Sequence, residues 1–193
     1  LLPENAPSEP YGIDVEVNAA PLPFFADFEG ASNGLLREVG WTTIAQGFEG
    51  YEFSLTQSES YSPTTSIWHR RGPEGLAAFK DWLVSPPISL ETVDQVQLTW
   101  WERGRYTEET NHSLWISTTS PDPRDADAFE KVMELPAPSE SWERSELIDL
   151  SAWSGSRVVY LAWYYEGQNA DDWYIDDVDV RALQPDIELT DVT

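Results

Sequence analysis

The sequence contains no cysteine, which excludes a disulfide framework and argues against a zinc site built on thiolates. Basic residues are also scarce, with 11 Lys and Arg against 35 Asp and Glu, and the lysines are Lys80 and Lys131 alone. The resulting net charge of −24 opposes binding to nucleic acid or to an anionic membrane surface. The same charge suits cation binding and solubility in a salty medium.

Long hydrophobic runs are missing as well. No stretch reaches the roughly 18 apolar residues of a membrane-spanning helix, so we expect no membrane insertion. No signal-peptide pattern is present, and the Pro-rich, acidic start LLPENAPSEP is typical of a linker from which a leader could have been removed. We therefore expect a tail over residues 1–10, one domain over 11–183, and a linker or the start of a following module over 184–193. The full-length chain would carry other domains on either side.

Aromatic residues are plentiful, and they lie in short segments of alternating polarity separated by Pro and Gly. Many short strands without alternating helices predict an all-β fold, an antiparallel β-sandwich of two sheets. The weak helical patterns are short, at 74–79 and 125–130. The expected strands span residues 11–17, 24–29, 40–44, 79–85, 93–103, 114–119, 129–135, 142–150, 158–165 and 171–180, with further short strands inside 45–75.

The last of these strands, DDWYIDDVDV at 171–180, mixes aromatic and β-branched residues with several carboxylates. Adjacent Asp176 and Asp177 repel each other, and in a half-buried strand at least one must lose water unless a positive charge compensates it. Because basic side chains are few, a bound cation is the favoured partner, and thiol-free, oxygen-rich surroundings favour calcium. The alternative is a solvated edge strand whose charges keep other strands away.

Several motifs occur together in a recognisable order: DWLVSP at 81–86, paired Trp100 and Trp101, LWIST at 114–118, IDLS at 148–151 and WYIDDVDV at 173–180. Over about residues 24–181 the chain resembles the jelly-roll modules called cleaved-adhesin or choice-of-anchor J domains, relatives of MAM domains. The resemblance implies a jelly-roll β-sandwich from an extracellular bacterial protein, secreted or attached to the cell surface.

The resemblance also implies a structural calcium ion that joins the N-terminal and C-terminal strands. The implied ligands come from the Phe28-Glu29 pair, the acidic residue before the LVS segment and the paired aspartates, with one more oxygen ligand nearby. In this sequence they are Asp27, Glu29, Asp81, Asp176 and Asp177. Residues 45–75 depart from the family pattern, so no second ion is expected there.

Ligand recognition is expected from aromatic residues and loops. Trp100 and Trp101 are adjacent in a strand, so one points into the core and the other to the opposite face. An outward Trp101 would stack on a sugar ring, with Glu102, Arg103 or Arg105 binding hydroxyl groups. Tyr106 and His112 flank the acidic segment 107–111 and are expected at a recognition loop.

Catalytic patterns are weak. The nucleophile motif G-x-S-x-G is absent, and His69 and His112 lack a third ligand pattern for a metal. Glu102 and Glu166 would serve as a glycosidase pair if both faced one concave sheet. We therefore expect a non-catalytic adhesion or carbohydrate/protein-binding module, with a glycan or a surface protein as its ligand. The alternatives are an accessory domain of a secreted peptidase and a glycoside hydrolase.

Overall fold

The computed structural model describes residues 17–183 except 32–33, 47–49, 73–78, 107–109, 126 and 168–171. The expected tail at 1–10, the linker at 184–193 and all of the expected first strand except Val17 lie outside the described residues.

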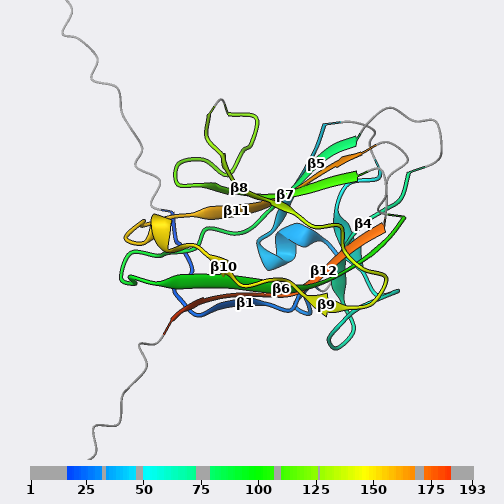
Figure 1. Cartoon of the computed structure of the whole chain (residues 1–193), viewed down its shortest axis with the longest axis horizontal. Helices are drawn as coiled ribbons and strands as arrows, with labels where there is room; N and C mark the ends of the chain where they lie inside the picture. Colours follow the sequence, from blue (N-terminus) through cyan, green and yellow to red (C-terminus); the bar gives the residue numbers. More distant parts are fainter. Residues whose placement is uncertain are drawn as a thin grey trace, which may run out of the picture.

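Seven strands form the larger of two sheets, and β1, β6, β9, β10 and β12 of this sheet lie in the lower part of Figure 1. Its main path runs β10-β6-β12-β4-β3, while β1 also pairs with β12 and β9 with β6. Every pairing between these strands is antiparallel. The strands are β1 (Phe24–Ala26), β3 (Ser54–Thr56), β4 (Ser66–His69), β6 (Val96–Arg105), β9 (Glu143–Arg144), β10 (Ile148–Asp149) and β12 (Asp172–Ala182).

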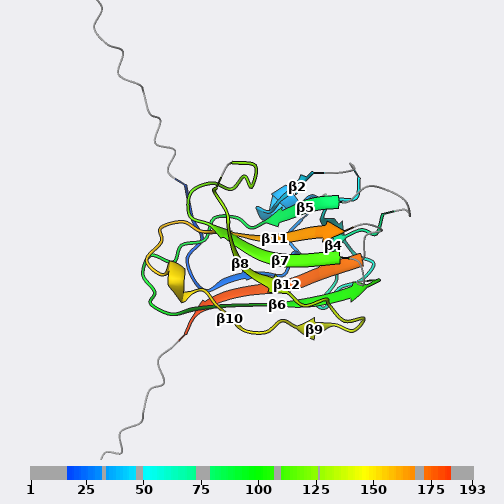
Figure 2. The ribbon, with the colours of Figure 1, turned by 45° about the horizontal axis from the view of Figure 1, so that its top comes forward.

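The second sheet has five strands in the order β2-β5-β11-β7-β8, and Figure 2 shows it stacked on the first. These pairings are also antiparallel. The predicted all-β, two-sheet jelly-roll sandwich is therefore confirmed. The strands are β2 (Thr42–Ala45), β5 (Phe79–Val84), β7 (Thr110–Ser117), β8 (Glu130–Leu135) and β11 (Tyr160–Gly167).

Two short 3-10 helices, η1 (Leu36–Val39) and η3 (Ser151–Trp153), are the helical elements of the described residues. The helical pattern at 125–130 is wrong, because its described residues form turns before β8 begins at Glu130. Most of the other helical pattern, 74–78, lies outside the described residues, and Phe79 opens β5. Among the described residues no helix has the length and apolar character needed to cross a membrane.

Alternation along β6 shows how the core forms between the sheets. Val96, Leu98 and Trp100 point inward and are almost fully buried, and the ring of Trp100 meets Trp163 of the opposite sheet at 5.5 Å. Trp101 points to the outer face, so the prediction that the two adjacent tryptophans face opposite ways is confirmed.

The strand β11 is buried on both faces, which explains why its sequence is almost continuously apolar. Leu161 and Trp163 lie in the main core. On the outer face of the five-stranded sheet, Tyr160 and Ala162 join a second cluster with Trp82, against which further aromatic side chains pack. Tryptophans therefore fill space on both sides of this sheet.

Candidate functional site

The carboxylates of β12 gather at an irregularity in the strand. The register between β12 and β6 shifts between Asp176 and Asp179, as in a β-bulge. Asp177 takes a left-handed backbone conformation with φ of 48°, and Phe28, at the turn after β1, does the same with φ of 61°. Aspartate tolerates this conformation better than most residues, so the bulge turns two neighbouring acids away from regular strand geometry.

Asp176 is fully buried and binds backbone groups rather than a basic side chain. One carboxylate oxygen accepts hydrogen bonds from the N–H groups of Tyr61 at 2.8 Å and Ser62 at 3.1 Å, and the other accepts from Asp177 N–H at 2.8 Å. Burial nevertheless dominates and raises the pKa of Asp176 to about 7. The acid thus fixes a segment more than a hundred residues away in the chain.

Glu29 and Asp177 hold the same segment from its other side. The carboxylate of Glu29 accepts hydrogen bonds from Thr64 N–H at 2.9 Å and Thr65 N–H at 2.6 Å, and the Thr64 hydroxyl donates a third at 2.6 Å. The Ser62 hydroxyl donates to Asp177 at 2.9 Å. Burial opposes ionisation of Glu29, but these hydrogen bonds outweigh it and lower its pKa. We call residues 59–65 the clamped loop.

Four of the five predicted calcium ligands therefore lie together beside the clamped loop. They are Asp27, Glu29, Asp176 and Asp177. Burial raises the pKa of Asp177, and the negative charges of Asp27 and Glu29 raise it further. The Asp27 carboxylate accepts a hydrogen bond from Glu29 N–H at 3.2 Å. Within the described parts of the chain, however, no group of three or more His, Asp or Glu side chains is arranged to hold a metal ion. The carboxylates bind the clamped loop instead.

Asp81, the fifth predicted ligand, is not brought to this place. It lies on β5 in the other sheet and is fully buried, where its carboxylate contacts His69 Nε2 of β4 at 2.8 Å. Its other oxygen accepts a hydrogen bond from Gln46 N–H at 3.3 Å. His69 pairs with Trp173, four residues before Asp177, which is about 13 Å away along an extended strand. Asp81 joins the two sheets through a buried pair.

The outer face of the seven-stranded sheet carries a set of contacting rings that we call the aromatic surface. Tyr61 of the clamped loop stacks on Trp101 with ring centroids 3.7 Å apart and planes 12° from parallel. Trp142 lies 6.2 Å from both Tyr61 and Tyr174, and Tyr174 stacks with Trp68 at 5.9 Å. The aromatic surface thus consists of Tyr61, Trp68, Trp101, Trp142 and Tyr174.

Charged groups border these rings. Arg103 pairs with Glu59 of the clamped loop at 2.6 Å, and Arg105 reaches the same carboxylate at 3.6 Å. The ring of Tyr106 is 60% exposed and lies 4.3 Å from the guanidinium of Arg71. The structure therefore places the predicted ligand residues Trp101, Arg103 and Arg105 on one face, although both arginines are engaged with Glu59.

The structure corrects the predicted position of His112. Its side chain is 2% exposed and lies between the rings of Trp173, at 4.3 Å, and Tyr165, at 5.5 Å. The strand β7 begins at Thr110, before the apolar run that the sequence shows, so His112 is inside the strand and faces the core. It does not lie on a recognition loop.

The suggested glycosidase pair is not assembled either. Glu102 is buried in the core and accepts a hydrogen bond from Trp173 Nε1 at 3.0 Å, and its burial raises its pKa. Glu166 lies on the other sheet, partly exposed and paired with Lys80 at 3.1 Å. These two carboxylates do not face a common cleft.

Sequence reasoning missed the role of the clamped loop. Its segment ESYSPTT is rich in hydroxyl groups and was expected only as part of a long structured excursion. Three carboxylates and Trp101 lie against it in the structure. The run of Ser and Thr beside Tyr61 is the feature of the sequence that could have predicted this role. Carboxylates without basic partners need hydroxyl and N–H donors, and this segment supplies them.

Neither a protein-family model nor a curated protein matches the sequence. Solved structures do resemble it. The K3 cleaved adhesin domain of Lys-gingipain from Porphyromonas gingivalis has a TM-score of 0.63 at 19% identity, over 83% of this chain and 98% of that one. A xylan-binding domain from Paenibacillus barcinonensis has a TM-score of 0.50 at 14% identity, over 86% and 98%.

A further similar structure is the glycoside hydrolase domain of Endo-D from Streptococcus pneumoniae, with a TM-score of 0.61 at 16% identity. It is matched over 86% of this chain but 29% of its own. Identities this low establish the fold alone. The chain has the two-sheet fold of cleaved adhesin domains, and the predicted relation to choice-of-anchor J and MAM domains stays a prediction.

Proposed function

We propose that the protein is a non-catalytic binding module that uses the aromatic surface to hold a carbohydrate or protein ligand outside the cell. The observation that carries this proposal is the ring of Tyr61. It is 42% exposed, rests on Trp101 and is kept in place by backbone hydrogen bonds to Asp176. A fixed ring beside charged groups offers both an apolar face and polar partners, as sugar-binding sites require.

The similar structures support a binding role, because they include adhesin domains and a xylan-binding domain. A secreted or surface location fits the same neighbours and the net charge of −24. In this proposal the chain is one module of a larger bacterial protein.

Screening the chain against soluble glycans and polysaccharides, for both binding and product release, tests this function. We expect saturable binding without turnover, weakened at least about tenfold by Tyr61→Ala. Phe25→Ala is the matched control, since Phe25 is an exposed ring, 55% accessible, outside the aromatic surface. Turnover would instead establish a glycoside hydrolase. If neither binding nor turnover is detected, an accessory domain of a secreted peptidase is favoured.

We also propose that a structural calcium ion binds beside the clamped loop, held by Asp27, Glu29, Asp176 and Asp177. The support is the repulsion at Asp177, whose pKa is raised by burial and by the charges of Asp27 and Glu29. In the described residues these carboxylates accept hydrogen bonds from the clamped loop and are not arranged as a metal site, so an incoming ion must draw them away from those donors. An ion that binds the folded state alone stabilises it by about 2.7 kcal/mol at a concentration 100 times its Kd. Calcium should therefore raise the thermal unfolding midpoint, and an unchanged midpoint in excess chelator would contradict the proposal.

A further inference from the structure

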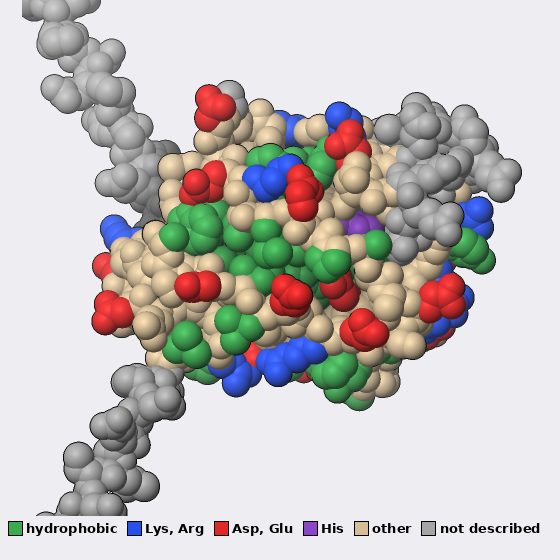
Figure 3. Space-filling view, viewed as in Figure 1, with side chains coloured by type: hydrophobic (Ala, Val, Ile, Leu, Met, Phe, Trp, Pro, Cys, Tyr) green, Lys and Arg blue, Asp and Glu red, His purple; other side chains and the backbone are tan. Residues whose placement is uncertain are grey.

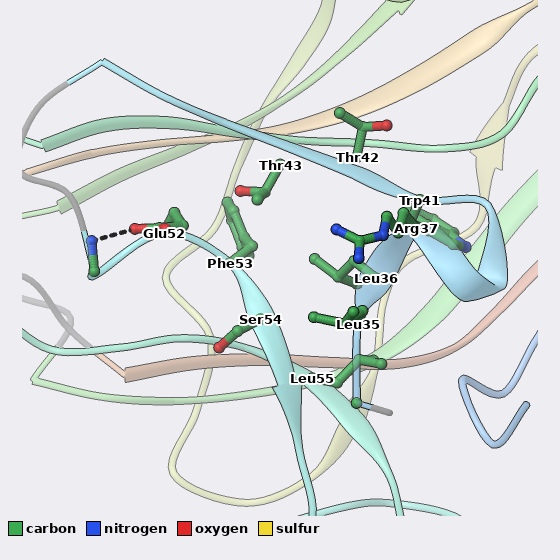
Figure 4. Close-up of a pocket in the computed structure, with 12 residues that line it drawn as sticks. Leu35, Leu36, Arg37, Trp41, Thr42, Thr43, Glu52, Phe53, Ser54 and Leu55 are labelled. Carbon is green, nitrogen blue, oxygen red and sulfur yellow. Dashed lines mark hydrogen bonds between the residues drawn. The ribbon is translucent and has the colours of Figure 1, made fainter. Parts of the chain in front are cut away.

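A groove runs beside β3, away from the rings of the aromatic surface. One cavity of about 490 Å³ lies between β2 and β3 and is drawn in Figure 4. A second, of about 450 Å³, adjoins it, because Gly34 and Leu55 line both. Together they are lined by chain positions 50 and 52–57, of which Ser54–Thr56 form β3. The groove therefore follows the whole of β3 and the residues on either side of it.

The strands on both sides of this groove are sheet edges. Among the described strands, β5 is the neighbour of β2, and β4 is the neighbour of β3. Each therefore has one side without a partner among the strands that the structure describes, and such an edge offers backbone N–H and C=O groups to an added strand. An extended peptide is the ligand class that uses these groups.

Arg37 of η1 supplies a positive charge to the groove. Figure 4 shows its guanidinium pointing into the space between β2 and β3. Its side chain is exposed, and no carboxylate of the described residues forms an ion pair with it, whereas Arg103 and Arg124 each have one. Glu52, which also lines the groove, accepts a hydrogen bond from Gly50 N–H instead. The guanidinium of Arg37 therefore remains available to a carboxylate of a ligand.

The rest of the lining is aliphatic and hydroxylated. Leu35 and Leu55 provide apolar walls, and Thr42 and Ser54 are exposed. The two aromatic residues that line the larger cavity, Trp41 and Phe53, are each only 1% exposed, so they offer no ring face for a sugar to stack on. The lining favours a peptide over a glycan.

We propose that this groove binds an extended acidic peptide segment along a free sheet edge, with a carboxylate of the peptide paired to Arg37. A guanidinium binds a carboxylate through two parallel hydrogen bonds, and the edge strand supplies backbone pairing. Alternate peptide side chains then meet the leucines. This second site goes beyond the proposed function, because it needs none of the rings of the aromatic surface.

Titration of the 15N-labelled chain with a blocked peptide of alternating Val and Thr that carries one central Glu tests the proposal by NMR. We expect saturable shifts of the Arg37 side-chain Nε–H and of β3 amides. The same peptide with Gln in place of Glu should bind at least about tenfold more weakly, as one charge-assisted pair predicts.

Variants separate the site from general charge effects. Arg37→Gln should weaken the acidic peptide about tenfold, whereas Arg157→Gln, an exposed arginine on the loop before β11, should not. Ser54→Asp, which adds a negative charge at an exposed edge position, should also weaken it, and Tyr61→Ala should leave it unchanged. The proposal is overturned if the Gln peptide binds as tightly as the Glu peptide, or if both arginine variants weaken binding equally. It is also overturned if no saturable binding is seen, or if an oligouronic acid binds more tightly than the peptide.

Discussion

Asp177 combines a left-handed backbone conformation with an electrostatically unfavourable position. Its φ of 48° suits Asp or Asn, and the Ser62 hydroxyl satisfies its carboxylate. Burial and the charges of Asp27 and Glu29 nevertheless raise its pKa. The residue type therefore fits the backbone, while burial and two neighbouring acids disfavour its charge.

Asp177→Asn tests this conflict, because asparagine keeps the backbone preference and a hydrogen-bond acceptor but removes the charge. In chelator we expect the free energy of unfolding to rise by up to about 1 kcal/mol, since one close repulsion disappears. With calcium present, the stabilisation by the ion should fall sharply. Chemical denaturation with and without calcium measures both. Asp94→Asn, at an exposed position, is the control, and a variant that is less stable in chelator would contradict the argument.

Asp176 gives the stability a pH dependence of defined sign. Burial raises its pKa from 3.8 to about 7, so the folded protein holds this proton more tightly than the unfolded chain does. Below about pH 4 both states are protonated, so the contribution of the residue to stability is fully present and does not change with pH. Between about pH 4 and pH 7 the unfolded chain ionises first, so stability falls as pH rises, and the loss is complete above pH 7.

Thermal melts in chelator at pH 5 and pH 8 check this expectation against Asp176→Asn. The substitution leaves at least one of the three backbone N–H groups without an acceptor and should cost about 1–3 kcal/mol at low pH. The variant should also lose part of the decline between the two pH values, because its side chain does not titrate. Parallel declines in the two proteins would assign the pH dependence to other groups.

At the scale of elements, the two sheets are joined by a buried hydrogen-bonded pair, Asp81 and His69, as well as by apolar contacts. Asp81 of β5 and His69 of β4 are both fully buried, and the His69 ring stacks on Tyr165 at 3.8 Å. Removing one member of such a pair leaves the other without its partner in the core, which is costly.

Asp81→Ala should therefore lower the free energy of unfolding by about 3–5 kcal/mol. Lys80→Ala is the matched control on the same strand, since its exposed pair with Glu166 is worth less than about 1 kcal/mol. Because the structure places Asp81 with His69, the midpoint rise caused by calcium should persist in Asp81→Ala. Loss of that rise would indicate that Asp81 is a calcium ligand, as the sequence predicts.

The clamped loop depends on Glu29 at the end of the chain segment that follows β1. Glu29→Ala removes the acceptor for the N–H groups of Thr64 and Thr65. We expect a loss of about 1–3 kcal/mol and much faster amide hydrogen exchange at both threonines. Glu91→Ala, at an exposed position, should change neither. Unchanged exchange at Thr64 in the Glu29 variant would show that the loop is held by other contacts.

Alternating polarity predicted most strands, because period-two patterns report directly which residues face a core. The predicted strand 142–150 is instead split into β9 and β10, which pair with β6 at separate places. The strand pattern alone did not predict that Asp176 lies near Glu29. That prediction came from the family resemblance. The strand pattern also did not show that Asp81 faces His69, because the partner of an inward side chain comes from the opposite sheet, which no local pattern encodes.

At the scale of the whole molecule, the apolar core opposes a surface of one dominant sign. The chain carries a net charge of −24, and acidic side chains are spread over the face seen in Figure 3, where basic ones are fewer. Self-repulsion of this kind destabilises the compact state, and dissolved salt screens it.

Raising NaCl from about 0.01 M to 1 M shortens the Debye length from about 30 Å to about 3 Å, so the thermal midpoint should rise continuously over this range. Screening depends on ionic strength alone, whereas a calcium site depends on the identity of the ion. CaCl2 should therefore raise the midpoint above the NaCl value at equal ionic strength, and MgCl2, whose smaller ion demands octahedral geometry, should raise it less. A midpoint that falls with NaCl would contradict the repulsion argument, and coincident CaCl2 and MgCl2 curves would remove the specific site while leaving the screening.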